Sequence, residues 1–345
     1  MERFSKWRDP ATGVAPFLLP LPAGQDALPP AVRFAVFPFA ALLGGARTLL
    51  VLLLLGAQAL LVEGVLRVAS PLPPVYSALS RAANASIARL ILAVVGVLWI
   101  PTETVRLQRS GRSPPQVPFA PQKGDLIVPN SSSWVDLLYL AFRFNPTFVL
   151  PVLSPSTSAS GKINGFRRVS LLTAVLSSGG LPQVQQDGGE SLEEALRKAA
   201  GPVVLFPEAT TSNNRALLKF AELSPASPSP TGGKPAVVRV FVLVFRYPAP
   251  TRFAPSLTHP IPSSPPLLPH LFTLTSRLLP LTFSIRRLHA SECPRLTLPA
   301  GANPKKEEWD ALAETLAGTG RLKRVGGLGW KEKEAFLEFR RVKGR

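Results

Sequence analysis

The sequence predicts an α/β fold in which helices flank a sheet, preceded by an apolar segment that associates with a membrane. Short apolar runs at 126–128 and 203–206 have the length of buried strands, and each leads directly into a polar loop. A helical pattern at 191–200 precedes the second run. Helices that alternate with such strands are typical of α/β sheets, whose ligands gather beyond the carboxyl ends of the strands. The two polar loops are therefore the predicted site.

The composition favours a basic, membrane-associated protein. Hydrophobic residues make up 46% of the 345 positions, which is high for a soluble protein. Lys and Arg outnumber Asp and Glu 39 to 21, and such a balance attracts nucleic acid, anionic lipid or phosphorylated substrates. Together with the apolar N-terminal part, the charge favours lipid, and no nucleic-acid partner is expected. The single Cys293 excludes an internal disulfide, and three scattered histidines predict no metal site.

The first hundred residues predict a tail followed by membrane-associated helices. Residues 1–30 are polar and broken by prolines, without the apolar core of a signal peptide, and we expect a cytosolic tail. Within 31–101, the run at 35–62 is apolar except for Arg47, and about 20 apolar residues suffice to cross a bilayer. The second run, at 90–100, is too short to cross alone and is expected to lie in the interface or to pair with the first.

Arg47 leaves the membrane topology open. A charge at the bilayer centre costs about 2.5 to 3.5 kcal/mol on insertion scales, unless its side chain reaches the interface. A bend at Gly44 and Gly45 would instead produce a re-entrant hairpin. In a third alternative, both apolar runs are core helices of the folded domain.

Positive residues follow the apolar segment with almost no acidic residues among them. Such residues mark the cytoplasmic side of a membrane, so we expect the next domain to face the cytosol. They are Arg106, Arg109, Arg112 and Lys123.

Residues 102–300 are predicted to form the α/β domain. Its first strand, 126–128, is followed by a helix that opens at Asp136. A capping box opens the helix at 191–200, and the run at 237–247 is the most β-prone part of the chain and is expected to be a core strand. The rest comprises two Pro-rich insertions, a helix and a strand, predicted respectively at 222–236, 248–269, 271–279 and 281–288.

Residues 301–345 are predicted to form a C-terminal helix and a basic tail. Pro304 opens the helix, in which Leu312 and Leu316 lie at helical spacing. The tail begins at Arg321 and is basic and amphipathic. It either contacts anionic lipid or is a solvated charged tail whose aromatic side chains pack on the domain. Those aromatic residues are Trp330, Phe336 and Phe339.

The polar loops carry two short motifs, at 130–136 (NSSSWVD) and at 206–212 (FPEATTS). The second resembles the FPEGT(R)S signature of the glycerolipid acyltransferases, the phospholipid/glycerol acyltransferase family, and departs from it at Ala209 and Thr211. The first resembles that family's NHxxxxD signature, with Ser131 in the place of the histidine.

The resemblance covers about residues 124–288 and is closest to the fungal lysophosphatidic acid:oleoyl-CoA acyltransferases. It implies a glycerolipid-acyltransferase-like sheet behind an N-terminal membrane helix or re-entrant hairpin. The implied activity is acyl transfer from acyl-CoA to a lysophospholipid, in particular lysophosphatidic acid, in glycerolipid synthesis. The implied partners are these two substrates and membrane lipids, with no cofactor beyond acyl-CoA as co-substrate. The implied location is the endoplasmic reticulum membrane or the surface of lipid droplets.

The catalytic pair of this family is a histidine that takes the proton of the acceptor hydroxyl and an aspartate that orients the imidazole. Asp136 matches the aspartate, and Ser131 stands at the histidine position. A hydroxyl does not titrate near neutral pH, so Ser131 cannot act as the base. Another histidine, the substrate phosphate or water must then take the proton, or catalysis has been lost. In a further alternative, Asp136 is only a helix cap.

The second loop holds the phosphate and glycerol of the acceptor in this family, so its matching residues inherit a substrate-binding role by resemblance. We expect Glu208 to orient a hydroxyl or a cation, because a carboxylate cannot pair directly with phosphate. The other substrate-binding residues implied by the two motifs are Asn130, Thr210 and Ser212.

Arginines are the expected phosphate ligands. Arg215 either supplies a bidentate guanidinium or is a solvent-facing charge. The family's arginine-containing middle signature falls at 165–168, which favours Arg168 for substrate binding. Spacing points instead to 185–187, which lacks arginine. Lys162 and Arg167 add to the positive field near 165–168.

Two rival functions remain open. A non-catalytic member of the same fold would bind lysophospholipids or acyl chains, as the departures at Ser131 and Ala209 suggest. A basic peripheral membrane or nucleic-acid adaptor would act through charge alone, with binding that collapses in salt. The histidines lie in or beside loops far downstream, and we expect surface or structural roles for them. They are His259, His270 and His289.

Overall fold

The computed structural model describes residues 4–20, 30–69, 71–108, 117–155, 160–187, 189–224, 235–251, 254–265, 267–299 and 303–343. Several predictions lie partly outside these residues. They are the N-terminal tail at 1–30, the charges at Arg109 and Arg112, the Pro-rich insertions at 222–236 and 248–269, and the C-terminal part at 301–345.

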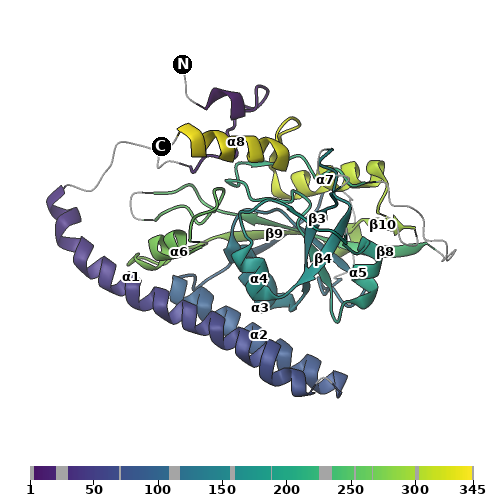
Figure 1. Cartoon of the computed structure of the whole chain (residues 1–345), viewed down its shortest axis with the longest axis horizontal. Coiled ribbons are helices and arrows are strands. Elements are labelled where there is room, and N and C mark those ends of the chain that lie inside the picture. The colour runs from purple at the N-terminus through teal and green to yellow at the C-terminus, as the bar shows by residue number, and fades with distance from the viewer. Residues whose placement is uncertain are drawn as a thin grey trace.

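A mostly parallel sheet runs through the middle of the α/β domain, as the sequence predicts (Figure 1). Its strands are β1 (Thr102–Val105), β2 (Leu126–Pro129), β3 (Thr147–Leu153), β4 (Gly165–Val169), β5 (Gln183–Val184), β6 (Val203–Leu205), β8 (Ala236–Arg246), β9 (Ser284–Leu288) and β10 (Arg295–Leu298). The order is β1-β9-β8-β2-β6-β3-β4, with β10 beside β8 and β5 beside β3. A separate pair joins β7 (Ala216–Leu217) to β11 (Lys323–Arg324).

The predicted strands at the polar loops and in the core are all present. β2 pairs in parallel with β6 on one side and with β8 on the other, so β2 lies in the centre of the sheet. β8 includes nearly all of the predicted core strand, and its residues 240–245 are all buried. A central strand covered on both faces needs such a continuous apolar run.

Helices cover both faces of the sheet. The side chains of β8 alternate between two apolar clusters: Phe241, Leu243 and Phe245 face one, and Val240, Val242 and Val244 face the other. Helices α1 to α4 and α6 pack on the first face, and α5 and α7 on the second. The helices are α1 (Pro30–Gln58), α2 (Pro73–Val95), α3 (Trp134–Phe144), α4 (Leu171–Leu176), α5 (Leu192–Lys198), α6 (Leu268–Thr275), α7 (Lys306–Gly320) and α8 (Trp330–Lys343).

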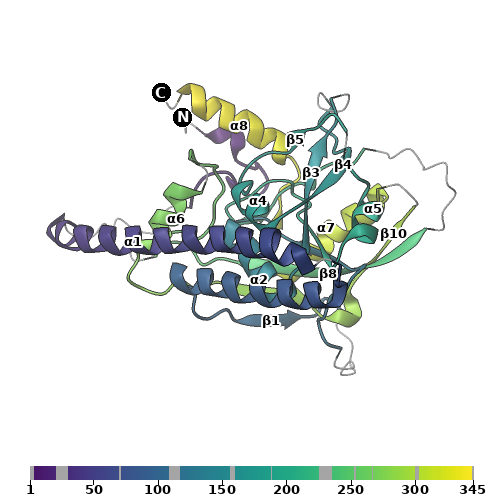
Figure 2. The ribbon, with the colours of Figure 1, turned by 60° about the horizontal axis from the view of Figure 1, so that its bottom comes forward.

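Helices α1 and α2 lie side by side along one flank of the domain (Figure 2). A π-helical stretch, Ala59–Gly64, and a 3-10 helix, Val65–Ala69, continue α1 toward α2. By length and composition, Val36–Gly64 and Val75–Val95 could each cross a membrane. The second apolar run forms the end of a longer helix than expected, and its expected pairing with the first apolar segment is confirmed.

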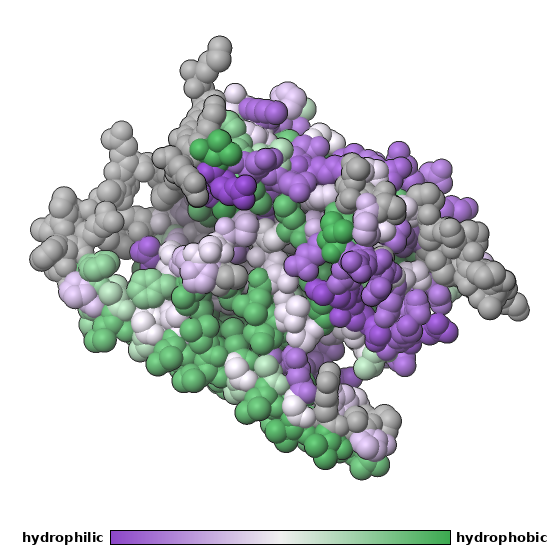
Figure 3. All heavy atoms as spheres, in the orientation of Figure 1, coloured by the Kyte–Doolittle hydropathy of each residue, from purple (hydrophilic) through white to green (hydrophobic). Residues whose placement is uncertain are grey.

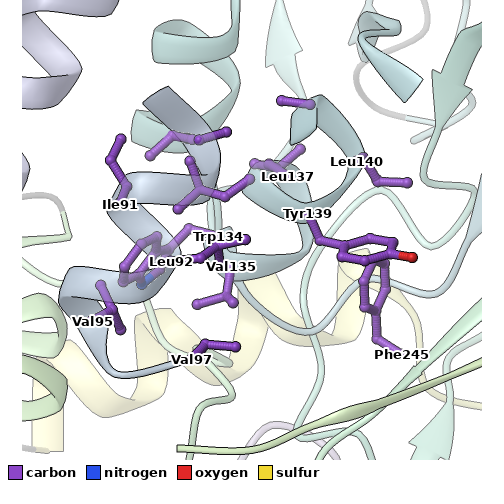
Figure 4. Close-up of a cluster of buried hydrophobic side chains, with 14 of the residues drawn as sticks. Ile91, Leu92, Val95, Val97, Trp134, Val135, Leu137, Tyr139, Leu140 and Phe245 are labelled. Atoms are coloured by element: carbon purple, nitrogen blue, oxygen red, sulfur yellow. The ribbon is translucent and has the colours of Figure 1, made fainter. Parts of the chain in front are cut away.

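The inner side of α2 is anchored on α3. Buried Ile91, Leu92 and Val95 pack with Trp134 and Val135 in one apolar cluster (Figure 4). Burying an aliphatic side chain of this size stabilises a fold by about 1.5 to 3 kcal/mol. The hairpin is therefore firmly joined to the helix that carries Asp136.

The charged side chain of Arg47 finds a hydrogen-bond partner within the protein. Its Nη1 donates to the carbonyl oxygen of Arg277 at 2.8 Å, just beyond the end of α6. The neighbouring Thr48 hydroxyl lies 2.8 Å from that of Thr275. A Cβ at Gly44 would come within 2.1 Å of the hydroxyl of Ser276, so this glycine lets α1 approach α6 closely. The helix continues unbroken through Gly44, and the predicted bend is absent.

The outer side of α1 is an exposed apolar surface (Figure 3). Phe37 is 67% exposed and Leu42 is 74% exposed, although both are large and apolar. Soluble monomers rarely expose contiguous apolar patches of this extent. The surface continues over several other residues: Phe39, Leu49, Leu52, Leu53, Leu60 and, from α6 and its end, Phe272, Leu278 and Leu279.

The described N-terminal segment, residues 4–20, packs on α8. Trp7 and Phe17 are buried against Phe336 of α8 in a third apolar cluster. Trp330 is also buried, which favours the packed-aromatic alternative for the C-terminal tail. Residues 4–20 are therefore held on the domain, with a 3-10 helix at Ser5–Trp7.

The remaining helix predictions are close to the structure. Ser191 caps α5 by accepting from the amide of Glu194 at 3.2 Å. α3 begins at Trp134, two residues before the predicted start, because Ser133 is its N-cap. The predicted helix at 271–279 is α6, displaced toward the N-terminus, and the C-terminal helix is α7. A short 3-10 helix, Ala290–Glu292, follows β9.

Candidate active site

The two polar loops meet beyond the carboxyl ends of β2 and β6. The backbone amide of Ser131 donates to Glu208 Oε1 at 2.7 Å, and the amide of Ser212 donates to the carbonyl oxygen of Ser131 at 2.9 Å. Because β2 and β6 are parallel neighbours, the loops that follow them emerge at the same edge of the sheet. Three of the predicted site residues are thus brought together.

Asn130 fastens the first loop to β8. Its Oδ1 accepts from the amide of Phe245 at 2.7 Å, and its Nδ2 donates to the carbonyl oxygen of Phe245 at 3.2 Å. The pairing of β8 with β2 ends at Leu243. Beyond that point, the carboxamide of Asn130 takes the place of a neighbouring strand for the backbone of Phe245. This is a scaffolding contact.

Asp136 occupies the third position of α3 and forms a capping box with Ser133. Its Oδ2 accepts from the amides of Ser132 at 3.0 Å and Ser133 at 2.8 Å. Its Oδ1 accepts from the hydroxyl of Tyr247. These contacts match the helix-cap alternative, and the partner at Oδ1 is a phenol. Complete burial raises the pKa of Asp136 to about 7, although the hydrogen bonds from Tyr247, Ser133 and Ser132 lower it.

Glu208 ties the loops together with both oxygens. Besides the amide of Ser131, the carboxylate accepts from the amide of Leu218 at 2.9 Å. Complete burial raises the pKa of Glu208 to about 8, and the two amide donors act against that rise. Since both carboxylate oxygens already have backbone partners, the side chain of Glu208 has a structural role and holds the first loop and Leu218 in place.

The second loop ends in hydroxyl groups that bind backbone. Thr210 Oγ1 donates to the carbonyl oxygen of Gly180 at 3.0 Å. Thr211 Oγ1 donates to the carbonyl oxygen of His259 at 2.6 Å. The hydroxyl of Ser212 lies 3.5 Å from the carbonyl oxygen of Ser131. Ala209 stands where the resembling signature has glycine, and its φ is +56°, in the left-handed region that glycine favours.

Lys333 of α8 is a site residue that the sequence interpretation missed. It is fully buried, and its Nζ donates to Thr210 Oγ1 at 2.7 Å and to the carbonyl oxygens of Thr211 at 2.9 Å and Gly179 at 3.2 Å. Burial lowers its pKa to about 7, and the nearby Glu208 opposes that shift. One feature of the sequence could have identified Lys333: it lies at helical spacing between Trp330 and Phe336, on the apolar side of α8.

Two adjoining pockets lie beside the two loops. The smaller, of about 60 Å³, is lined by Ser131, Ser133, Thr210 and Thr211 among others, and we call it the inner chamber because both motif loops line it. The larger, of about 380 Å³, includes Arg167 and His259 in its wall, and we call it the outer chamber. The chambers share the wall residues Leu150, Pro151, Ser177, Ser178, Gly180 and Ala209.

The arginines are placed differently from the expectation. Arg168 pairs with Glu190, with 3.1 Å between Nη2 and Oε1, at the surface of β4. Arg215 is exposed and lines neither chamber. Arg167 lines the outer chamber, and its Nε is buried without a partner among the described residues. Arg167, and not the predicted Arg168 or Arg215, is therefore the arginine that can contact a ligand in this cavity.

The histidines separate into three environments. His270 Nδ1 accepts from the indole of Trp134 at 2.9 Å, and its Nε2 lies 3.2 Å from the carbonyl oxygen of Ser256. His289 Nδ1 lies 2.7 Å from the hydroxyl of Ser291 near the surface. His259 is 4% exposed and lines the outer chamber. Nothing in the residues around position 259 indicated that it would reach the site.

Among the described residues, no three His, Cys, Asp or Glu side chains lie close enough together to bind a metal ion. Cys293 is a free thiol, and burial raises its pKa to about 11, which keeps the thiol protonated at neutral pH.

Over nearly its whole length, the chain is similar to a protein that is named as an acyltransferase. A protein of Schizosaccharomyces pombe (strain 972 / ATCC 24843), named "Putative lysophosphatidic acid:oleoyl-CoA acyltransferase", is 26% identical over 351 residues, which cover 99% of each chain. No family model matches the chain, and no solved structure matches it. The similarity is distant, and it loosely supports acyl transfer in lipid synthesis.

Proposed function

We propose that this protein transfers an acyl group from acyl-CoA to the free hydroxyl of a lysophospholipid, with lysophosphatidic acid as the acceptor. The observation that carries the proposal is the contact between the two motif loops, Ser131 to Glu208, at the wall of a cavity. The full-length similarity to the Schizosaccharomyces pombe protein supports it. The site would work on the cytosolic face of the endoplasmic reticulum membrane or on lipid droplets.

The cavity provides the parts that such a transfer needs. Arg167 in the outer chamber can pair with the acceptor phosphate, and the inner chamber leads to the loops. The acyl chain of the acceptor stays in the bilayer, against the exposed apolar surface of α1 and α6. Holding both substrates in one geometry supplies a large part of the rate of a two-substrate reaction.

The contacts of α1 favour a hairpin that lies along the membrane surface. α1 touches α6 at residues 44–48, and α2 is packed on α3. A helix that crossed a bilayer would place its middle about 15 Å from either edge of the hydrocarbon core. α6 would then have to enter the hydrocarbon with it. In our proposal the apolar side of α1 enters one leaflet, and the α/β domain remains in water.

The direct test is acyl transfer from radiolabelled oleoyl-CoA to lysophosphatidic acid by the purified chain in detergent. Preparations of an Asp136→Asn variant and of a matched Asp310→Asn variant, changed at an exposed site on α7, run beside it. We expect turnover by the native chain, lowered at least tenfold by Asp136→Asn and unchanged by Asp310→Asn. An amide at position 136 cannot accept all three present hydrogen bonds, so the first loop would shift.

No turnover by the native chain would contradict the proposal. Gain of turnover in a Ser131→His variant alone would then identify a lipid-binding descendant whose catalysis was lost at that position. Contaminating acyltransferases are controlled by a mock purification from cells without the chain.

A further inference from the structure

His259 is clamped between the two motif loops by its own backbone. Its amide donates to the carbonyl oxygen of Ser132 at 2.8 Å, and its carbonyl oxygen accepts from Thr211 Oγ1 at 2.6 Å. A Cβ added at Gly179 would lie 3.1 Å from His259 Nδ1, so this glycine lets the ring lie close to the cavity wall. A segment from the Pro-rich insertion thereby places an imidazole next to the loop from which the motif histidine is missing.

The imidazole of His259 has unused hydrogen-bonding capacity. Both ring nitrogens are buried and have no partner within the described part of the chain. Leaving a buried polar group unpaired costs about 1 to 3 kcal/mol, so such groups in native structures call for an explanation. The rings of His270 and His289 each have a partner, so the orphan nitrogens are confined to the histidine that lines the cavity.

We propose that His259 is the general base of this site, taking over the role of the histidine absent at position 131. The assignment rests on the proposed acyltransferase function. The acceptor oxygen attacks the thioester carbonyl carbon as its proton passes to a ring nitrogen of His259. The new C–O bond forms, the C–S bond breaks, and the proton passes on to the departing thiolate of CoA.

Bound substrate must raise the basicity of the ring for this role. In the free protein, burial lowers the pKa of His259 to about 3, with contributions from His270 and Lys333, so the imidazole is neutral but a weak base. The ring of His270 is stacked on it with 4.8 Å between centroids. Arg167 lines the same chamber, and a phosphate bound there brings negative charge that raises the basicity of the imidazole. Protein atoms cover both ring nitrogens of His259. A bound substrate must therefore displace residues of the outer chamber wall, which includes Pro262 and Ser263, to reach them.

The test compares His259→Gln with a matched His289→Gln variant, using full-length protein in detergent with oleoyl-CoA and lysophosphatidic acid. Glutamine keeps most of the volume and polarity of histidine but cannot take up a proton at neutral pH. General-base catalysis contributes about 10² to 10⁴ in rate, so kcat should fall by that factor in His259→Gln. The KM for lysophosphatidic acid should stay within threefold, and His289→Gln should match the native chain.

A second readout separates catalysis from folding. The Ser131→His, His259→Gln double variant should recover part of kcat, because an imidazole returns to the first loop. Lysophosphatidic acid binding and the melting temperature should be unchanged in His259→Gln. If the glutamine variant is unstable, His259→Asn takes its place.

Two results would overturn the assignment in different ways. A folded His259→Gln that keeps more than a third of the native kcat would remove His259 as the base and leave the acyltransferase function intact. No turnover by the native chain would overturn both proposals together.

Discussion

Glu208 and Ser131 lie 77 positions apart in the chain, yet a 2.7 Å hydrogen bond joins the carboxylate of one to the backbone amide of the other. The contact involves only the backbone of Ser131. The contact therefore requires no particular side-chain chemistry at position 131, where serine stands in place of the histidine of the resembling motif. The framework of the site can thus persist while the chemistry at position 131 changes.

The raised pKa of Glu208 predicts how stability depends on pH. Folded, this carboxyl has a pKa of about 8, against an ordinary value of 4.5, so the folded chain keeps a proton that the unfolded chain loses. Its contribution is fully present below pH 4.5 and is lost as pH rises through 8. Asp136 acts in the same direction up to about pH 7. His259 and His270, whose pKa values are lowered to about 3 and about 4, act in the opposite direction below pH 6.5. We therefore expect the free energy of unfolding in urea to rise less, or fall more, with pH between pH 5 and pH 7 in the native chain than in Glu208→Gln.

An exposed Glu334→Gln variant on α8 is the control for that slope, and it should follow the native chain. Equal slopes in the native chain and in Glu208→Gln would refute the assignment of the pH dependence to Glu208. The window ends at pH 7 because Lys333, whose pKa is lowered to about 7, makes stability rise with pH above that point.

Lys333→Met should loosen the second loop. Methionine keeps most of the buried volume but leaves the carbonyl oxygens of Thr211 and Gly179 without their donor. Unsatisfied buried acceptors cost about 1 to 3 kcal/mol, and we expect a loss of that order in the free energy of unfolding. Lys123→Met, at an exposed position, should be neutral. If the two variants are equally stable, the buried ammonium does not hold the loop.

Ala209→Gly should stabilise the fold. A left-handed conformation costs an alanine about 1 to 2 kcal/mol, and glycine avoids most of that cost while losing some chain entropy. We expect a gain of about 1 kcal/mol by urea denaturation. The matched change Ala311→Gly, on the exposed side of α7, should instead lose about 1 kcal/mol. A loss at both positions would show that the strain at Ala209 is not real.

Arg47→Met should free the end of α6. The variant removes the guanidinium that donates to the carbonyl oxygen of Arg277, and amide hydrogens in 268–277 should then exchange faster with deuterium. Arg81→Met, at an exposed site on α2, is the control. If exchange in α6 is unchanged but binding to anionic vesicles weakens, Arg47 serves the lipid headgroups and not the helix.

The framework of the site could be predicted from the sequence because it depends on local patterns. Short apolar strands followed by polar loops predicted β2 and β6, and their parallel pairing brought 130–136 and 206–212 together. Ser133 and Asp136 form a capping box, which is also a local pattern.

The residues that complete the site could not be found in this way. His259, Tyr247 and Lys333 enter from three distant segments, and each reaches the loops only through long-range packing. Arg47 shows the same limit. Its cost in a membrane was visible from the sequence, but its partner at the end of α6 lies 230 positions away.

The pairing of the chain ends also bears on how the protein is made. Asn213, next to the second loop, donates to the carbonyl oxygens of Ala15 at 2.8 Å and Leu18 at 2.9 Å, while Lys333 reaches that loop from the other terminus. The sheet can form while synthesis continues, since domains fold as their residues emerge from the ribosome. The second loop acquires its buried ammonium only after α8 has left the exit tunnel. During synthesis, this loop is therefore expected to remain without that support for a time after the sheet has formed.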